Sequence, residues 1–195
     1  MNSKIEAMRL KLIQELDEPR YQHTLGVMYT AASMAMRYGE DVEKALIAGL
    51  LHDCAKCIPA PVKVILCEKY QIHISEIERV NPGLLHAKLG EFLAQQEYGV
   101  EDTDILMAIR SHTTGRPEMS LLEKIIYIAD YMEPGRKELP NMADVRKLAF
   151  EDIDKCLYRI LKDSLVYLKS KDFAIDPMTE ETFHYYHAIM EGEHA

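Results

Sequence analysis

Six histidine and aspartate side chains are the residues of this sequence whose types and order best fit metal chemistry. A His-Asp doublet follows an apolar run at 45–51, and the other four residues flank it along the chain. Imidazole and carboxylate together suit borderline transition metals, and six ligands are too many for one ion that must also hold water. Two ions that share a bridging Asp would use all six, which predicts a dinuclear metal hydrolase. The six candidates are His23, His52, Asp53, His86, His112 and Asp130.

The two aspartates stand where a helix does not favour a carboxylate. Asp53 and Asp130 each follow an apolar run near the C-terminal end of an expected helix, and the helix dipole disfavours negative charge there. Burying a carboxylate beside apolar neighbours is costly unless it is paired or metal-bound, so metal ligation is the favoured interpretation of both. Taken alone, His86 and His112 fit a hydrogen-bonded core histidine equally well, and for His23 a core or surface role is the commoner one.

Helical periodicity dominates the rest of the chain and predicts an all-α fold with about nine helices. Apolar residues recur at steps of three and four, and capping residues such as Asp41, Asp102 and Ser120 mark helix starts. Nothing is convincing as a strand, and no internal repeat is found. The expected segments are 3–16, 19–38, 41–56, 62–70, 81–98, 102–113, 120 to about 130, 151–171 and 179–191.

Bulk composition restricts the class of protein. A chain of 195 residues can bury a core of its own. Its net charge of −9, from 23 basic and 32 acidic residues, argues against a non-specific binder of nucleic acid or anionic membranes. The four cysteines form no secreted disulfide framework, and neither a signal peptide nor a membrane-spanning run is recognisable. We therefore expect a soluble protein of the reducing cytoplasm.

Taken in order, these residues resemble the HD-domain superfamily of metal-dependent phosphohydrolases. The resemblance is closer still to its YqeK family, whose members hydrolyse dinucleoside tetraphosphates symmetrically. It covers residues 19 to about 190, and five blocks in order at matching spacing make it far more specific than a bare His-Asp doublet. The blocks are 20–24, 51–56, 81–86, 109–115 and 124–136.

This resemblance implies a single HD domain over residues 1–195, built as a helical bundle with its core at about 19–135. The helices at 151–191 would pack on that core and close the nucleotide site. The family holds two divalent or mixed-valence ions, most often iron, with manganese, cobalt and zinc as alternatives. Asp53 would bridge the ions, with His23, His52 and Asp130 on one and His86 and His112 on the other.

The implied reaction is symmetrical cleavage of diadenosine tetraphosphate to two ADP. A metal-bound water would supply hydroxide near neutral pH, and nearby cations would neutralise the phosphates. Asp53 and Lys56 are the expected catalytic residues, since one holds both ions and the other lies one turn after His52 on the same face. The expected nucleotide contacts are Arg20, His23, Asp53, Gly83, Leu84, Leu85, His86, Arg110, Asp130, Arg136, Ala174, Ile175, Asp176, Pro177, Met178, Thr179 and Glu180.

One segment departs from the family pattern. The stretch Asp176-Pro177-Met178-Thr179 stands where the family usually has His-Pro-x-Thr. The change leaves the expected metal ligands untouched and bears only on how the segment at 172–180 would close over the nucleotide.

Other functions fit the same six ligands. They are another nucleotide phosphohydrolase of the HD type, a di-iron oxygenase, and a nucleotide sensor without turnover. Four cations near the ligands favour a polyphosphate, and the intact ligand set argues against an inactive site. The expected partner is a small-molecule dinucleoside polyphosphate or nucleoside diphosphate, with no nucleic acid or membrane. A homodimer is an open alternative to a monomer.

Overall fold

Every regular element in the described residues of the computed structural model, 3–171 and 174–192, is helical. The all-α prediction is confirmed, with eleven α-helices there in place of about nine. They are α1 (Ser3–Leu12), α2 (Glu18–Tyr38), α3 (Val42–Leu51), α4 (Ala60–Lys69), α5 (Glu76–Val80), the 3₁₀-helix η1 (Pro82–Leu85), α6 (His86–Tyr98), α7 (Thr103–Ser111), α8 (Leu121–Met132), α9 (Met142–Glu151), α10 (Ile153–Ser170) and α11 (Pro177–Met190).

Local sequence signals explain where the longest central helix begins and ends. The carboxylate of Asp17 accepts a hydrogen bond from the backbone N–H of Arg20, and Pro19 occupies the first turn of α2, where its missing N–H costs nothing. Gly39 ends the helix in the left-handed conformation, at φ 77°, which a residue with a side chain rarely adopts. The predicted segment 19–38 is therefore confirmed within one residue.

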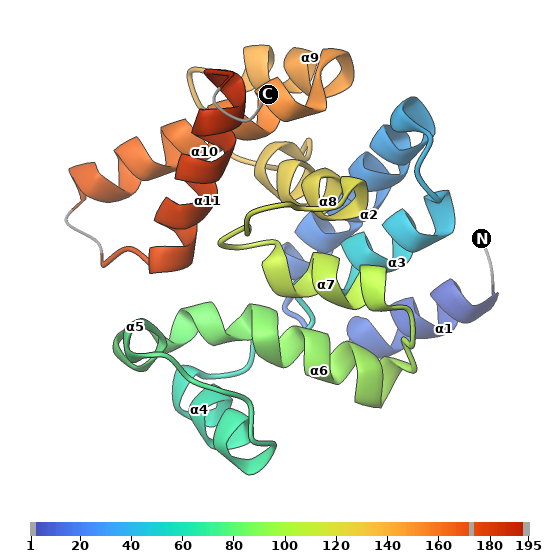
Figure 1. The fold of residues 1–195 in the computed structure, drawn as a ribbon. Coiled ribbons are helices and arrows are strands. Elements are labelled where there is room, and N and C mark those ends of the chain that lie inside the picture. Colours follow the sequence, from blue (N-terminus) through green and yellow to red (C-terminus); the bar gives the residue numbers. More distant parts are fainter. Residues whose placement is uncertain (1–2, 172–173, 193–195) are drawn as a thin grey trace.

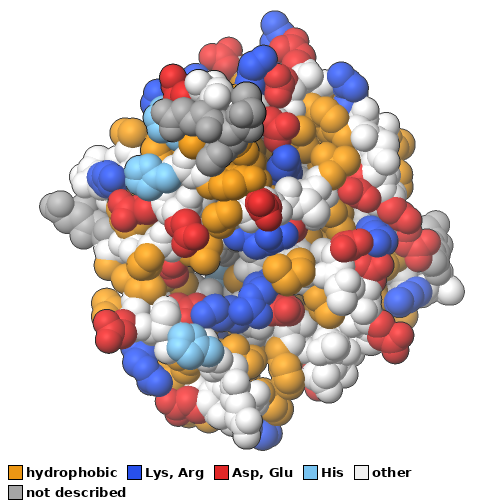
Figure 2. Space-filling view, viewed as in Figure 1, with side chains coloured by type: hydrophobic (Ala, Val, Ile, Leu, Met, Phe, Trp, Pro, Cys, Tyr) orange, Lys and Arg blue, Asp and Glu red, His pale blue; other side chains and the backbone are white. Residues whose placement is uncertain are grey.

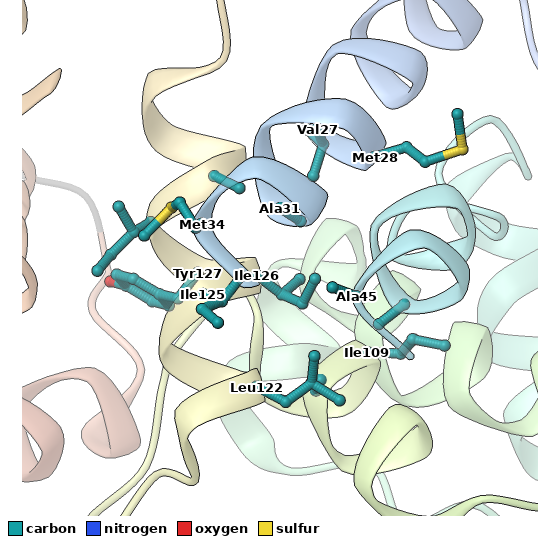
Figure 3. Packing of buried hydrophobic residues seen from close by; sticks show 14 of the residues in the cluster. Val27, Met28, Ala31, Met34, Ala45, Ile109, Leu122, Ile125, Ile126 and Tyr127 are labelled. Carbon is teal, nitrogen blue, oxygen red and sulfur yellow. The ribbon is translucent and has the colours of Figure 1, made fainter. Parts of the chain in front are cut away.

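The central helices pack through apolar side chains. Val27, Met28, Ala31 and Met34 of α2 face Ala45 of α3, Ile109 of α7, and Leu122, Ile125 and Ile126 of α8 in one buried cluster (Figure 3). In Figure 1, α2, α3, α7 and α8 form the middle of the molecule, with α4 and α5 beyond α6 and with α9 to α11 on the other side. Elements far apart in the sequence thus share one core.

Gly49 lets α3 approach α2 more closely than any other residue would. A Cβ atom at this position would lie 2.8 Å from Cα of Met28, inside the distance that real Cβ atoms adopt. This contact brings the end of α3, which carries His52 and Asp53, against the helix that carries His23. Helix packing here determines how far apart these three side chains lie.

Three predicted helices differ in the structure, and the first of them, expected at 3–16, ends at Leu12. The helix expected at 41–56 ends at Leu51, and a series of turns follows to residue 57. The helix expected at 81–98 is divided into η1 and α6, because the Pro-Gly pair favours a turn before the helix proper. The helices α5 and α9 were not expected. The five residues of α5 are too few to show a period, whereas Met142, Val145 and Ala149 of α9 do recur at helical spacing that the prediction did not use.

The C-terminal helices rest on the loop between α7 and α8. The hydroxyl oxygen of Tyr186, on α11, accepts a hydrogen bond of 2.9 Å from the backbone N–H of Met119. Gly115 in the same loop has a φ of 66°, and a Cβ there would collide with Thr182 of α11. No helix in 3–171 or 174–192 has both the length and the apolar character needed to cross a bilayer.

Replacing Gly49 with Ala should lower the free energy of unfolding by about 1–3 kcal/mol, the usual cost of overpacking a tight core. Gly90→Ala is the matched control. Gly90 lies within α6, and a Cβ atom there would meet Ile109 of α7 at an ordinary 3.5 Å. The variant should therefore leave the free energy of unfolding unchanged or raise it by up to about 1 kcal/mol, because alanine has the higher helix propensity. Urea unfolding of the two variants measures the difference. Equal effects would contradict the role given to the α2–α3 contact.

Candidate metal centre

The structure brings all six sequence-predicted ligands into one cluster at the ends of the central helices. His23 lies in α2, and Asp130 lies in the last turn of α8. The other four stand where a helix ends or begins: His52 and Asp53 follow α3, His112 follows α7, and His86 is the first residue of α6.

Asp53 lies between two groups of imidazole nitrogens. Its Oδ2 atom is 3.4 Å from Nε2 of His52 and 3.9 Å from Nε2 of His23. Its Oδ1 atom is 3.3 Å from Nε2 of His86 and 3.5 Å from Nε2 of His112. Each carboxylate oxygen therefore faces a different pair of rings.

Asp130 belongs to the first of these groups. Its Oδ1 atom lies 2.9 Å from Nε2 of His23 and 3.7 Å from Nε2 of His52. One ligand atom each from His23, His52 and Asp130 lie within 4.8 Å of one another, and the same holds for His52, Asp53 and His112. Both triplets have the spacing that a coordinated ion requires.

Buried polar atoms without partners show that the cluster suits a metal ion. Within the described part of the chain, Nε2 of His23, Nε2 of His52 and Oδ1 of Asp53 are buried and have no hydrogen-bond partner. Such orphaned atoms are costly unless something binds them. The donor set, imidazole nitrogen with carboxylate oxygen, is one that divalent transition metals prefer. The cluster is therefore suited to binding divalent metal.

The opposite ring nitrogens are held in place. Nδ1 of His52, His86 and His112 lies 2.7, 2.6 and 2.7 Å from the backbone carbonyl oxygens of Gly49, Gly83 and Ile109. A carbonyl can only accept, so each Nδ1 carries the proton and each Nε2 presents its lone pair to the centre of the cluster. Neutral rings in this tautomer are the form that binds metal.

Charge in the cluster keeps the carboxylates ionised. Burial raises the pKa of a carboxyl, but the interactions with His52 and His112 outweigh it and hold the pKa of Asp53 well below its ordinary value. For Asp130, burial is likewise outweighed by His23, His52 and Arg136, so its pKa is also lowered. Burial, assisted by His112 and Lys56, lowers the pKa of His86.

Three cations surround the cluster. Nη1 of Arg20 donates to Oδ2 of Asp53 at 2.8 Å, and Arg136 donates to both the backbone oxygen and Oδ1 of Asp130. Nζ of Lys56 lies 3.1 Å from Nε2 of His86 and 3.6 Å from Oδ1 of Asp53. The positive charge expected beside the ligands is therefore present.

Three adjoining cavities open beside the cluster. One of about 410 Å³ is lined by His112 and Asp130 together with Lys56 and Arg136. It shares Thr113, Tyr127 and other lining residues with a cavity of about 1030 Å³, which in turn shares Thr113, Thr114 and Leu84 with one of about 730 Å³. Figure 2 shows several Lys and Arg side chains gathered around a hollow near the middle of this face.

Residues 174–179, which run from the link after α10 into the first turn of α11, line two of these cavities. Ala174 and Thr179 line the cavity of about 1030 Å³, and Pro177 and Met178 line the cavity of about 730 Å³. Ile175 and Asp176 line both cavities. Asp176 also caps α11 by accepting from the N–H of Met178. Residues 172 and 173 of the predicted 172–180 segment lie outside the described residues.

Other predicted nucleotide contacts have local partners. Arg110 lines the 730 Å³ cavity and pairs with Glu91 at 2.7 Å. Leu85 is fully buried in a small apolar cluster, and Glu180 pairs with Lys169 at 3.3 Å. Gly83 contributes its carbonyl oxygen to Nδ1 of His86.

Two residues of the cluster were not expected from the sequence. Oγ1 of Thr113 is 3.1 Å from Nε2 of both His86 and His112, and Oε1 of Glu133 is 3.0 Å from Nδ1 of His23. Thr113 directly follows a predicted ligand, so it had a sequence signal of proximity. Glu133 had a stronger one, because it stands three residues after Asp130 and before a Pro-Gly pair.

Comparisons with known proteins identify the family of this chain. The family model for the HD domain matches residues 20–135. The protein named symmetrical bis(5'-nucleosyl)-tetraphosphatase in Bacillus subtilis (strain 168) is 45% identical over 181 residues, which are 92% of this chain and 94% of that protein. Its namesake in Staphylococcus aureus (strain NCTC 8325 / PS 47) is 35% identical over 184 residues, 93% of this chain and 94% of the relative.

A solved structure is similar over nearly the whole chain. It is a crystal structure from Clostridium acetobutylicum named as a predicted HD superfamily hydrolase involved in NAD metabolism, with a TM-score of 0.91 and 42% identity. The match covers 94% of this chain and 97% of that one. The resemblance seen in the sequence is thereby confirmed. This chain belongs to the HD-domain family and, within it, to the family of symmetrical bis(5'-nucleosyl)-tetraphosphatases.

Proposed function

We propose that this protein hydrolyses diadenosine tetraphosphate symmetrically to two ADP at a site for two divalent ions. The observation that carries the proposal is the position of Asp53, whose two oxygens face two separate pairs of histidines. Relatives that share 35–45% of their residues with this chain over most of its length bear the name of this activity.

The ligand sets follow from which oxygen each ring faces. Asp53 Oδ2 would join His23, His52 and Asp130 on one ion, and Asp53 Oδ1 would join His86 and His112 on the other. Iron suits this donor set, as do manganese, cobalt and zinc. Such ions, when bound, lower the pKa of a coordinated water and polarise the phosphoryl oxygens.

The cations around the cluster would bind the substrate phosphates. In the structure Arg20 forms an ion pair with Asp53, and Arg136 forms one with Asp130. Lys56 is about a third exposed and lies next to both His86 and Asp53, so its ammonium group would reach a phosphate held at the cluster. Charge that accumulates on the departing diphosphate would be stabilised by these groups without reorganisation of the site.

The cavities beside the cluster would hold the nucleosides. Tyr127 and Tyr131 line both the 410 Å³ and the 1030 Å³ cavities, and Tyr167 and Ile175 line the larger one farther from the cluster. Aromatic and apolar groups of this kind bind a base through stacking and burial. The polyphosphate would then run from these walls toward the cluster, which favours a dinucleoside polyphosphate over the oxygenase alternative.

Asp53→Asn should remove both the bound metal and the activity, because the neutral amide offers one oxygen where two ions need a charged carboxylate. We expect less than one metal equivalent per chain and no measurable release of ADP. Asp104→Asn is the control, since this exposed carboxylate pairs with Lys44 far from the cluster. Elemental analysis and chromatography of products measure both quantities. Two equivalents of metal and a normal rate would refute the bridging role.

His86→Ala should leave one ion bound, because His23, His52, Asp53 and Asp130 form a complete set without it. Metal content should fall from two equivalents to one, and the same is expected of His112→Ala. His187→Ala serves as control, because this ring lies against Tyr158 on the C-terminal helices. Retention of two ions in either variant would contradict the second ligand set.

Products and charge test the reaction itself. ADP should be the only nucleotide formed from diadenosine tetraphosphate. Lys56→Met should lower the rate by about 10- to 1000-fold, as expected for the loss of one charge contact to the transition state. Lys155→Met is the control, because this exposed lysine pairs only locally with Asp152. Formation of AMP and ATP would refute the symmetrical cleavage even if the metal assignments held.

A further inference from the structure

His23 differs from the other three cluster histidines in the group that holds its Nδ1 atom. His52, His86 and His112 stand at helix ends, where the carbonyl three residues earlier is within 2.7 Å of the ring. His23 lies inside α2, where the neighbouring carbonyls already belong to the helical hydrogen bonds. Its Nδ1 is instead held at 3.0 Å by the carboxylate of Glu133.

The side chain of Glu133 is buried and held in place by local backbone contacts. It follows the last residue of α8 and is 2% exposed. Its Oε2 atom accepts a hydrogen bond from the backbone N–H of Gly135 at 2.5 Å. Arg146 donates to its backbone oxygen and not to its carboxylate. The charged group is therefore directed at His23 by local backbone.

Two glycines make room for this carboxylate. Gly26 stands one turn after His23 in α2, and a Cβ atom there would overlap Oε2 of Glu133. A Cβ on Gly135 would lie 3.0 Å from the same oxygen. Any residue other than glycine at position 26 would have to displace the Glu133 side chain. The absence of a side chain at this site is thus a condition for the His23–Glu133 contact.

We propose that Glu133 is the positioning residue for the metal site formed by His23, His52 and Asp130, with Gly26 as the cradle that admits it. Its carboxylate fixes the Nδ1–H tautomer and the ring orientation of His23. A charged acceptor also raises the basicity of the coordinating Nε2 more than a backbone carbonyl does. The inference rests on the proposed metal site, and it adds Glu133 as a residue on which the metal affinity of that site depends.

The effect is confined to one side of the cluster. Glu133 contacts His23, and the other three rings are held by backbone carbonyls that a change at position 133 leaves in place. Loss of the carboxylate should therefore lower the affinity for one ion and leave the affinity for the other unchanged. A change that merely destabilised the fold would lower the affinity for both ions.

The test is calorimetric titration of the metal-free protein with Mn²⁺, without any nucleotide. Glu133→Gln keeps the size of the side chain and removes its charge. We expect Mn²⁺ affinity at one of two sites to fall about 10- to 100-fold, the usual cost of losing such a partner. Gly26→Ala should cause a similar fall, and the double variant should be no worse than the single ones, because both act through one contact.

Glu123→Gln is the matched control. This buried carboxylate lies in the first turn of α8, the helix that Glu133 follows, and it accepts hydrogen bonds from Ser111, Arg116 and the backbone of Ser120. The variant should unfold at a lower temperature and bind Mn²⁺ as the wild type does. Unchanged Mn²⁺ binding in Glu133→Gln, or an equal loss in Glu123→Gln, would overturn the proposal.

The same measurements separate this inference from the proposed activity. A wild-type protein that binds two Mn²⁺ ions and leaves diadenosine tetraphosphate intact would refute the activity. The Mn²⁺ titrations of Glu133→Gln would still test the positioning role, because they contain no nucleotide. Normal cleavage by the wild type with unaltered Mn²⁺ affinity in both Glu133→Gln and Gly26→Ala would refute the positioning role alone.

Discussion

The burial of one carboxylate, that of Asp53, is the constraint around which the rest of the structure is arranged. An ionised group with 1% exposure is stable only if positive charge or donors surround it on every side. Arg20 and Lys56 supply part of those surroundings, and four imidazole rings present the nitrogens that would hold a cation against the carboxylate. The groups come from α2, from the start of α6, from the end of α7 and from the turns after α3, so the packing of α2, α3, α6 and α7 has to satisfy this one side chain.

Much of this arrangement could be predicted from the residues themselves. The apolar periods and caps of α2, α3, α7 and α8 are strong local signals, and four of the six ligands, His52, Asp53, His112 and Asp130, stand at or just after the ends of α3, α7 and α8. The resemblance to a family of phosphohydrolases rested on the same blocks and was confirmed over most of the chain. Carboxylates after apolar runs, as at Asp53 and Asp130, were informative because the helix dipole and burial both oppose them.

The remainder could not be predicted because it depends on contacts between distant segments. Glu133 meets His23 across 110 positions of sequence. Its place three residues after Asp130 indicates that it lies near the cluster, but nothing in the sequence identifies His23 as its partner. Gly26 and Gly49 appear in the sequence as weak points of helices, although the structure uses each for a close approach. The helices α5 and α9 are short and partly polar, so their formation depends on the neighbours against which they pack.

The order of the ligands along the chain has a consequence for how the protein acquires its metal. His23 and Asp130 are 2.9 Å apart in space but lie at opposite ends of the domain matched by the HD family. During synthesis the nascent chain offers scattered histidines until α8 has left the ribosome and folded onto α2. Capture of the ion proposed for the set that contains His23 and Asp130 would then be a late event, coupled to completion of the fold. The metal that is free in the cell at that moment, rather than the order of Irving–Williams affinities alone, would decide which ion the finished enzyme carries.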